Sequence, residues 1–480
     1  MQITSSYDVK IVGRRLARPL RVTTKIYRDA LEYLIPVIYE HWKDICAVPA
    51  GDPRFNYTDA LVHTAGTHTA ICDFDDQFYK MPSYFRRACV KDAMGDVSSY
   101  VSNYENWVAG GKQGAEPKLT AKRHACPTFY KDNMYKAAKA GAPAQIKLFD
   151  GKDWVWMDLP LRQTDLKYIQ KYFWHANMSA PTLEKRHGSW QLRFAFTETV
   201  HFPDKAIQDQ KICAVDLGIN KDAVCCIMDA HGTVLARAFI DFPSEKDLIY
   251  RILNRIRKLQ RQYGNKNGAV KNAWAYAKRL NDELARHIAA AIFQFAADHD
   301  VDCIVFEFLD MKGRLRGRKK QRLAMWKKNT IQKIVEHRAH RAGMRFSHIC
   351  AWGTSALAFD GSGRIIRGRK NLTKREIRQL IPLLGTKKPM PKDGRAETYT
   401  NKETCTFQNG KEYNCDLSAS YNIGARYFIR SLLAETSETD HAEIIKLIPD
   451  AEKAPSHTLN TLKSLWAFYN KPTGQQAAGA

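Results

Sequence analysis

The sequence lacks any long hydrophobic run and any secretory signal. Its most apolar stretch, Ile288–Ala297, spans ten residues and is interrupted by Gln294, so it is too short to cross a bilayer. Residues Met1–Leu20 carry basic side chains but no apolar core of the kind that a signal peptide needs. We therefore expect a soluble protein with no membrane partner.

Cysteine pairs are also missing. The 11 cysteines are odd in number and irregularly spaced, and no two of them form a Cys-x-x-Cys pair. This pattern argues against a disulfide framework and is typical of a reducing compartment. We expect a prokaryotic cytoplasmic protein with access to the nucleoid, in which most cysteines are small core residues.

Glycine and proline are scarce, and acidic residues are outnumbered by basic ones. With 27 Gly and 18 Pro among 480 residues, collagen-like and low-complexity classes are excluded, and the length predicts several domains. Lys and Arg total 75 against 50 Asp and Glu, which gives a formal net charge of +25. Such a surface attracts phosphates, so nucleic acid is the expected partner.

Hydrophobic periodicity predicts a multidomain α+β and α/β chain with a mixed first half. That half is expected to hold a helix over 23–48 and strands within 145–202. The second half alternates strands and helices. Its strands are expected within 211–220, 223–228, 233–240, 303–308 and 345–351, and its helices at 244–262, 269–299 and 416–433.

Three acidic residues stand out in the second half: Asp216 ends an apolar strand, Glu307 lies within another, and Asp416 opens the last helix. Taken singly, Asp216 could cap a turn and Asp416 could cap its helix. Taken together, the order of elements predicts an RNase H-like layer, in which the first and fourth strands are neighbours. Three hard oxygen ligands there suit Mg²⁺. Two such ions could activate a water and stabilise the leaving oxygen of a phosphodiester.

The segments around these carboxylates carry a family resemblance. They resemble the three split RuvC motifs of the TnpB family and its descendants, the compact type V CRISPR effectors, at 214–220, 304–308 and 415–424. The last of them matches the pattern D-x-x-A-x-x-N-I at Asp416, Ala419, Asn422 and Ile423.

The resemblance implies an RNA-guided DNA endonuclease with one RuvC active site. In that site Asp216, Glu307 and Asp416 would be the catalytic residues and would bind two Mg²⁺ ions. The implied partners are a guide RNA and target double-stranded DNA with a short flanking motif.

The family order also implies a domain layout. It consists of a wedge-like β-barrel (1–14 and 142–209), a helical recognition region (15–141), a RuvC domain (210–352 and 412–434), a target-loading insert (353–411) and a C-terminal extension with a disordered tail (435–480).

The sequence departs from the family at the insert, where relatives carry two cysteine pairs of a zinc ribbon. Ala358 and Gly361 stand where the first pair is expected, and Cys405 and Cys415 are the cysteines that lie nearby. A tetrahedral zinc site needs about four N or S ligands. We therefore predict no structural zinc.

Two kinds of side chain are predicted to contact nucleic acid, although core packing or a solvated helix face could explain each of them. Bases stack on aromatic rings and Arg holds phosphates, which favours a cluster at Tyr84, Phe85, Arg86 and Arg87. A basic stretch with few acids to balance it predicts contact with the heteroduplex or the guide backbone for Arg314, Arg316, Arg318, Lys319, Lys320 and Arg322. The same role is predicted for three cations off the apolar face of the 244–262 helix, Arg251, Arg255 and Lys258.

Two other functions stay open at this point. One is a transposase-like nuclease that works without a guide RNA. The other is an RNA-guided DNA-binding protein that does not cut, and the intact set of carboxylates argues against it. The sequence has no run of coiled-coil heptads that would indicate a dimer, so monomer and dimer both stay open.

Overall fold

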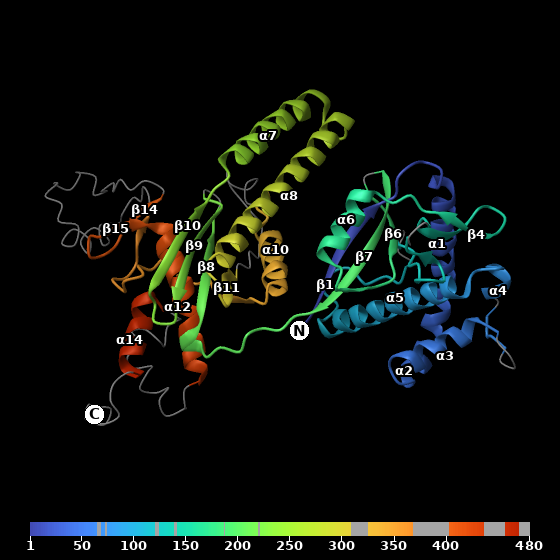
Figure 1. Ribbon diagram of the computed structural model, residues 1–480, viewed down its shortest axis with the longest axis horizontal. Helices are drawn as coiled ribbons and strands as arrows, with labels where there is room; N and C mark the ends of the chain where they lie inside the picture. Colours follow the sequence, from blue (N-terminus) through green and yellow to red (C-terminus); the bar gives the residue numbers. More distant parts are fainter. Residues whose placement is uncertain are drawn as a thin grey trace. The chain divides into compact units, whose positions relative to one another are not determined.

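The computed structural model shows two compact units (Figure 1). It describes residues 1–64, 69–72, 74–120, 124–138, 142–186, 188–218, 221–308, 325–367, 403–435 and 457–469. The N-terminal unit comprises Gln2–Thr199, and the C-terminal unit comprises Val200–Ala480 with Met1. The finer five-part domain layout stays a prediction. Among the described residues, no helix combines the length and apolar character that crossing a bilayer requires.

The N-terminal unit contains two antiparallel sheets. The first strand, β1 (Gln2–Lys10), pairs along its whole length with β7 (Ser189–Thr199), so the start of the chain joins a sheet formed by residues far along the sequence. β7 also pairs with β5 (Asn177–Met178) and β6 (Thr182–Arg186). The smaller sheet consists of β2 (Tyr135–Lys136), β3 (Gln145–Phe149) and β4 (Trp154–Asp158).

Helices surround these sheets. The longest are α1 (Ala17–Glu40) and α5 (Ser83–Ala109), and the shorter ones are α2 (Trp42–Ala47), α3 (Asp52–Val62), α4 (Phe74–Gln77) and α6 (Gln163–Tyr172). Tyr27 of α1 is buried against Phe85 of α5, with ring centroids 5.1 Å apart, and its hydroxyl donates to Asp92 at 2.6 Å. The predicted helix over 23–48 is therefore wrong in its bounds, because α1 begins at Ala17 and a second helix starts after His41.

The C-terminal unit is built on a five-stranded sheet in the order β10-β9-β8-β11-β12. β9 runs antiparallel to both β8 and β10, whereas β11 runs parallel to β8 and to β12. The five strands predicted from apolar runs are confirmed as β8 (Lys211–Leu217), β9 (Ala223–Asp229), β10 (Val234–Ile240), β11 (Cys303–Phe308) and β12 (Arg345–Cys350).

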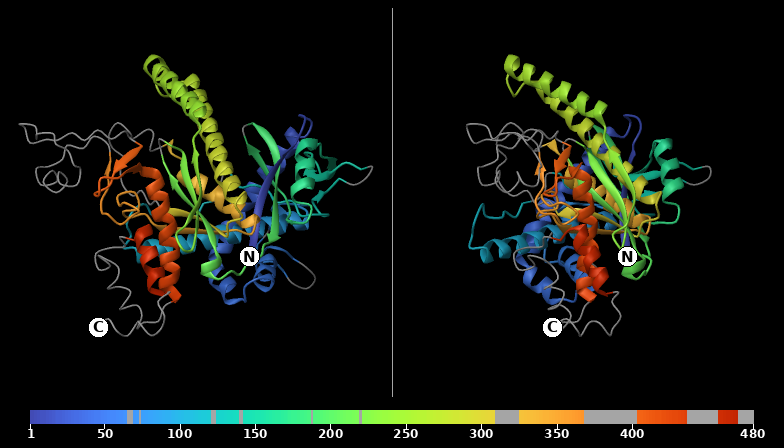
Figure 2. Two further views of the ribbon diagram at one scale, coloured as in Figure 1. Left: turned by 60° about the vertical axis from the view of Figure 1, so that its left-hand side comes forward. Right: turned by 90° about the vertical axis from the view of Figure 1, so that its left-hand side faces the viewer.

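Helices cover both faces of this sheet (Figure 2). Successive side chains of a strand point to opposite faces, so Cys213 and Val215 of β8 pack on one side, and Ile212 and Ala214 on the other. The first side is covered by α8 (Gly268–Ala297) and α10 (Lys328–Arg341), and α7 (Pro243–Tyr263) packs against α8. The second side is covered by α12 (Cys415–Glu435) and α14 (Leu459–Tyr469), and a 3₁₀ turn at Ile207–Asp209 precedes β8.

Helix α12 lies unusually close to the centre of the sheet. A Cβ atom added to Gly424 would lie 3.1 Å from Sδ of Met228 on β9 and 3.3 Å from Cβ of Ala214 on β8. Few side-chain atoms approach as closely as this, so the absence of a side chain at residue 424 sets the distance between the helix and the two strands.

Replacing Gly424 by Val inserts a branched side chain into this contact. We expect the full-length protein to lose about 1–3 kcal/mol of stability, because overpacking a filled core forces backbone shifts. The thermal melting midpoint measures the loss. Gly95→Ala in α5 is the control, since nothing lies within 4 Å of the added Cβ, and its midpoint should be unchanged or raised. A Gly424→Val protein that melts like the wild type would contradict the close contact.

Candidate active site

Asp216 and Glu307 lie at equivalent positions on neighbouring strands. The parallel pairing of β8 with β11 sets Phe306 opposite Val215, and the next residue along each strand is one of the two acids. Both acids share the strand face of Ala214 and Val305, which packs under α12. Two carboxylates therefore leave adjacent strands on the same side of the sheet.

Asp416 stands in the first turn of the helix that covers that side. The side-chain Oδ1 of Asn414 accepts hydrogen bonds from the backbone N–H groups of Asp416 at 3.1 Å and of Leu417 at 2.9 Å. Asn414 therefore caps the helix. The capping role that the sequence allowed for Asp416 is filled by this residue, two positions earlier. The Asp416 side chain is half-buried.

Glu307 is held from two directions. Its side chain is buried, and one carboxylate oxygen, Oε1, accepts a hydrogen bond from the Thr354 hydroxyl. Its backbone carbonyl accepts a hydrogen bond from Nε2 of Gln332 on α10 at 3.1 Å. Since Thr354 is itself 1% exposed, this hydroxyl fixes the orientation of the carboxylate from below the surface.

The turn that carries Thr354 is fastened to α12 by Asn422. The Nδ2 group of this fully buried residue donates to the backbone carbonyls of Thr354 at 3.0 Å and of Leu357 at 2.9 Å, and its Oδ1 accepts from Leu459 N–H of α14 at 3.3 Å. The motif asparagine therefore joins three segments that converge beside Glu307.

A buried cation lies in the same region. Arg426 is 4% exposed, and its guanidinium donates to the carbonyls of Cys350, Trp352 and His457 at 2.9, 2.6 and 3.0 Å. Burial lowers the pKa of Arg426, and the negative charge of Glu307 is among the influences that oppose this shift. The Arg426 guanidinium therefore places a positive charge near Glu307.

The donor set fits a magnesium ion in its chemistry. Mg²⁺ takes hard oxygen ligands, and protein sites hold it through one or two carboxylates together with waters and substrate phosphates. Within the described ranges, no three His, Cys, Asp or Glu side chains lie together as a ready-made metal group.

The insert has an apolar core where a zinc ribbon was considered. Its strands β13 (Ile366–Arg367), β14 (Thr404–Thr406) and β15 (Glu412–Asn414) form a small antiparallel sheet. The side chains buried together beside it are Ala358, Cys405, Phe407 and Cys415. Across the two turns that flank this core, Asn409 donates to Asp360 at 2.9 Å. The absence of structural zinc from the insert stays a prediction.

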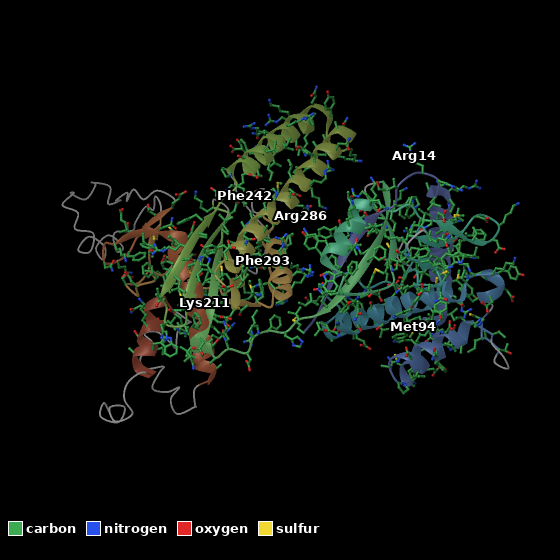
Figure 3. The ribbon with its side chains drawn as sticks, viewed as in Figure 1. Arg14, Met94, Lys211, Phe242, Arg286 and Phe293 are labelled. Atoms are coloured by element: carbon green, nitrogen blue, oxygen red, sulfur yellow. The ribbon has the colours of Figure 1, made fainter. Side chains whose placement is uncertain are left out.

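The predicted cations of α7 lie on its exposed side. Ile249, Leu253 and Ile256 form the buried stripe of the helix, whereas Arg251, Arg255 and Lys258 are exposed. Figure 3 shows nitrogen-tipped side chains along this helix. These cations are accessible to phosphates, and their contact with nucleic acid stays a prediction.

The cluster at residues 84–87 is divided by the fold. Phe85 is a core residue, and Arg86 is 5% exposed, with its guanidinium paired to Asp59 at 3.3 Å and to Asp75 at 3.6 Å. The prediction that Arg86 contacts nucleic acid is therefore corrected. Arg86 forms a buried structural ion pair, and its guanidinium is not accessible at the surface. Tyr84 is 41% exposed, and Arg87 stacks over Phe55 at 4.5 Å.

The basic residues from Arg314 to Arg322 and the predicted C-terminal tail lie outside the described residues. The partners of Glu307 were not predicted from the sequence. Thr354 and Gln332 lie 47 and 25 positions away along the chain, and no local pattern marks either residue. Asn422 belongs to the D-x-x-A-x-x-N-I motif, and this motif is the sequence signal that indicated a role for its side chain.

Comparisons with known proteins give limited matches. A family model described as the Aq_aa04 family matches residues 4–150, and no curated protein matches the chain. Among solved structures, the chain is similar to Cas12f1 in complex with sgRNA and target DNA, with a TM-score of 0.44 and 12% identity over 74% of this chain and 91% of that chain.

Two larger structures show similar likenesses. A Cas12i variant with crRNA and dsDNA has a TM-score of 0.41 and 10% identity, over 86% of this chain and 70% of that one. AacC2c1 with sgRNA has a TM-score of 0.42 and 9% identity, over 87% and 70%. These structural neighbours are Cas12 effector complexes at low identity, and because every TM-score is below 0.5, the function must be inferred from the chain's own residues.

Replacing Asn422 by Ala removes three buried hydrogen bonds. We expect a loss of about 2–4 kcal/mol, because the carbonyls and the N–H left behind stay buried without partners. Hydrogen exchange of residues 351–358 in the full-length protein should become at least about tenfold faster. Asn409→Ala, which removes an exposed hydrogen bond, is the matched control and should change exchange there little. Equal protection in the two variants would show that Asn422 does not hold the turn.

Proposed function

We propose that this chain is an RNA-guided DNA endonuclease with a single RuvC-type active site, related to the TnpB family and the compact type V effectors. The observation that carries the proposal is that Asp216 and Glu307 leave the neighbouring strands β8 and β11 on the face that is covered by α12, the helix with Asp416 in its first turn. The strand order, with the first strand central and the fourth parallel beside it, supports an RNase H-like domain. The three motifs in the correct order support the family.

The residues of the site would divide the work among them. Asp216, Glu307 and Asp416 would hold two Mg²⁺ ions, which when bound supply an activated water and neutralise charge on the scissile phosphate. Thr354 would orient Glu307 by donating to one of its oxygens. Arg426 would place a positive charge near Glu307, and the capped first turn of α12 would fix the position of Asp416.

A guide RNA and a target DNA duplex are the proposed partners. The net charge of +25 and the exposed cations of α7 support a phosphate-rich ligand. In this mode base pairing selects the target, whereas the protein binds the shape of the heteroduplex and reads a short flanking motif. The apolar core of the insert supports a target-loading element without zinc.

Removing any one carboxylate should stop cleavage and spare binding. We expect Asp216→Ala, Glu307→Ala and Asp416→Ala each to lower the rate by about 10²- to 10³-fold or more, the scale for losing a charge that stabilises the transition state. The measurement is cleavage of target DNA in Mg²⁺ by the protein with its RNA, alongside RNA affinity. Glu283→Gln on α8, with a side chain 54% exposed, is the control. Robust cutting by Asp216→Ala would refute the site.

Neutralising the α7 cations should weaken nucleic-acid binding and make it less dependent on salt. The triple change Arg251→Gln, Arg255→Gln and Lys258→Gln removes up to three phosphate contacts. Each lost contact should reduce the slope of log affinity against log salt by about 0.9 on a duplex.

The control for this experiment removes the same charge elsewhere. Lys152, Lys167 and Lys171 are exposed residues of the N-terminal unit, and their triple change to Gln matches the α7 variant in net charge. A slope that changes equally in both variants would mean that general charge, and not the α7 surface, determines binding.

A further inference from the structure

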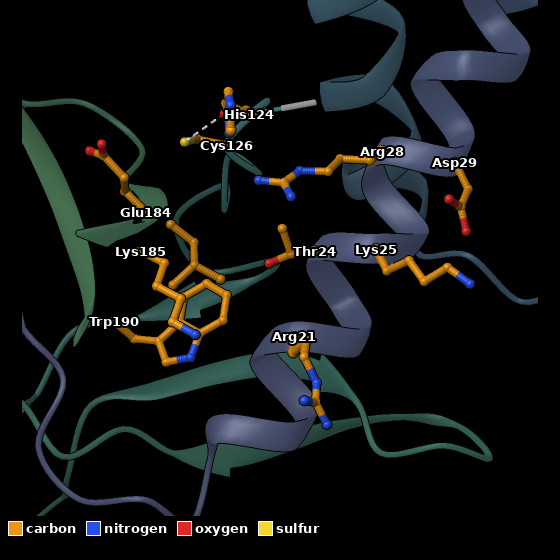
Figure 4. Close-up of a pocket in the computed structure, with 11 residues that line it drawn as sticks. Arg21, Thr24, Lys25, Arg28, Asp29, His124, Cys126, Glu184, Lys185 and Trp190 are labelled. Carbon is orange, nitrogen blue, oxygen red and sulfur yellow. Dashed lines mark hydrogen bonds between the residues drawn. The ribbon is translucent and has the colours of Figure 1, made fainter. Parts of the chain in front are cut away.

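A cavity of about 520 Å³ lies in the N-terminal unit, between α1 and the hairpin of β6 and β7 (Figure 4). Its size falls within the range of about 300–1,000 Å³ that is typical of small-molecule sites. Figure 4 shows Thr24 and Arg28 extending from α1 into the space that faces Lys185 and Trp190. Nothing in the proposed active site uses these residues.

The α1 wall of the cavity is cationic. Arg21, Lys25 and Arg28 recur at intervals of four and three residues, which places them along one side of the helix, and all three line the cavity. Two acids, Asp29 and Glu184, also line it, and the Glu184 carboxylate is paired with Arg193 at 2.9 Å and with Arg186 at 2.5 Å. The charge of Glu184 is therefore offset, and the lining still holds more cations than acids, which favours an anionic group.

The opposite wall presents an aromatic face. Trp190 on β7 pairs in register with Lys185 on β6, and the Lys185 ammonium lies 5.5 Å from the indole centroid. Trp190 is half-buried and packs by its inner part on the core. A flexible lysine over an indole is easily displaced, and a nucleobase gains more by stacking there than the exposed cation does.

A second cavity adjoins the first at the same two residues. It measures about 620 Å³ and shares Lys185 and Trp190 with the first, while Lys10 and Arg14 add two further cations to its lining. Arg14 is labelled in Figure 3. The Trp190 indole is therefore shared by two cavities that are each lined by cations.

We propose that these cavities bind an unpaired nucleotide of a single-stranded segment, with the base stacked on Trp190 and the flanking phosphates held by Arg21, Arg28 and Arg14. The inference rests on nucleic acid being the partner in the proposed function, but it does not depend on cleavage. A plain aliphatic core residue at 190 would serve packing equally well, whereas the combination of indole and cations serves stacking.

Photo-crosslinking tests the site directly in the full-length protein. The probes are a short oligouridylate that contains 4-thiouridine and the matching DNA oligomer with 4-thiothymidine, each followed by peptide mapping. We expect crosslinks within residues 185–190, and the probe that reacts more strongly identifies an RNA or a DNA strand as the source. Crosslinks that fall elsewhere with both probes would overturn the assignment.

Variants of Trp190 separate stacking from folding. Trp190→Leu should lower the affinity for the better oligomer by about 5- to 150-fold, the range for one base–aromatic stack, and Trp190→Phe should recover most of it. Quenching of a 2-aminopurine base should follow the same order. Trp174→Leu, at a residue 78% exposed and outside both cavities, is the matched control.

Each outcome bears on one proposal at a time. An unchanged affinity and unchanged quenching for a folded Trp190→Leu protein, checked by circular dichroism, would overturn the nucleotide site and leave the nuclease proposal intact. If Trp190→Phe lost as much affinity as Trp190→Leu, stacking would also be rejected. Asp216→Ala should bind the oligomers like the wild type, so a failure of cleavage would leave this inference standing.

Discussion

The close contact of α12 with the central strands is the constraint on which the candidate site depends. Because Gly424 has no side chain, the helix approaches Ala214 and Met228 to near van der Waals distance. That contact fixes where the helix begins, and Asn414 caps it at that point. The position of Asp416 relative to β8 and β9 therefore depends on this distance.

A set of buried polar groups supports the contact of α12 with the central strands. Asn422 ties the turn at Thr354 to α12, Thr354 contacts Glu307, and Arg426 places a positive charge nearby. The turn also leads into the insert, whose apolar core contains Cys415 at the start of α12. Glu307 and the described part of the insert are thus connected through hydrogen bonds and packing. A movement of the insert would therefore change the contacts of Glu307.

The strands of the C-terminal sheet could be predicted from the sequence because apolar runs are a local signal, whereas the catalytic role of the three acids stays a prediction. Apolar runs indicated all five strands of the C-terminal sheet, and short motifs marked the carboxylates. Long-range partners could not be predicted. The buried ion pair of Arg86 is an example. Its partner Asp59 lies 27 residues earlier, and nothing in the sequence indicates that the fold brings the two together. The helical spacing of the α1 cations is present in the sequence, but only the fold shows that these cations and Trp190 line one cavity.

The central claim is that a bound RNA directs a cut made by the three carboxylates. The most direct measurement is to sequence the RNA that co-purifies with the protein from its native locus, and then to assay cleavage of DNA that matches its variable end. The account predicts one dominant structured RNA, and cutting in Mg²⁺ only of the matching DNA. Cutting of unmatched DNA by RNA-free protein would contradict the account and would favour a transposase-like nuclease.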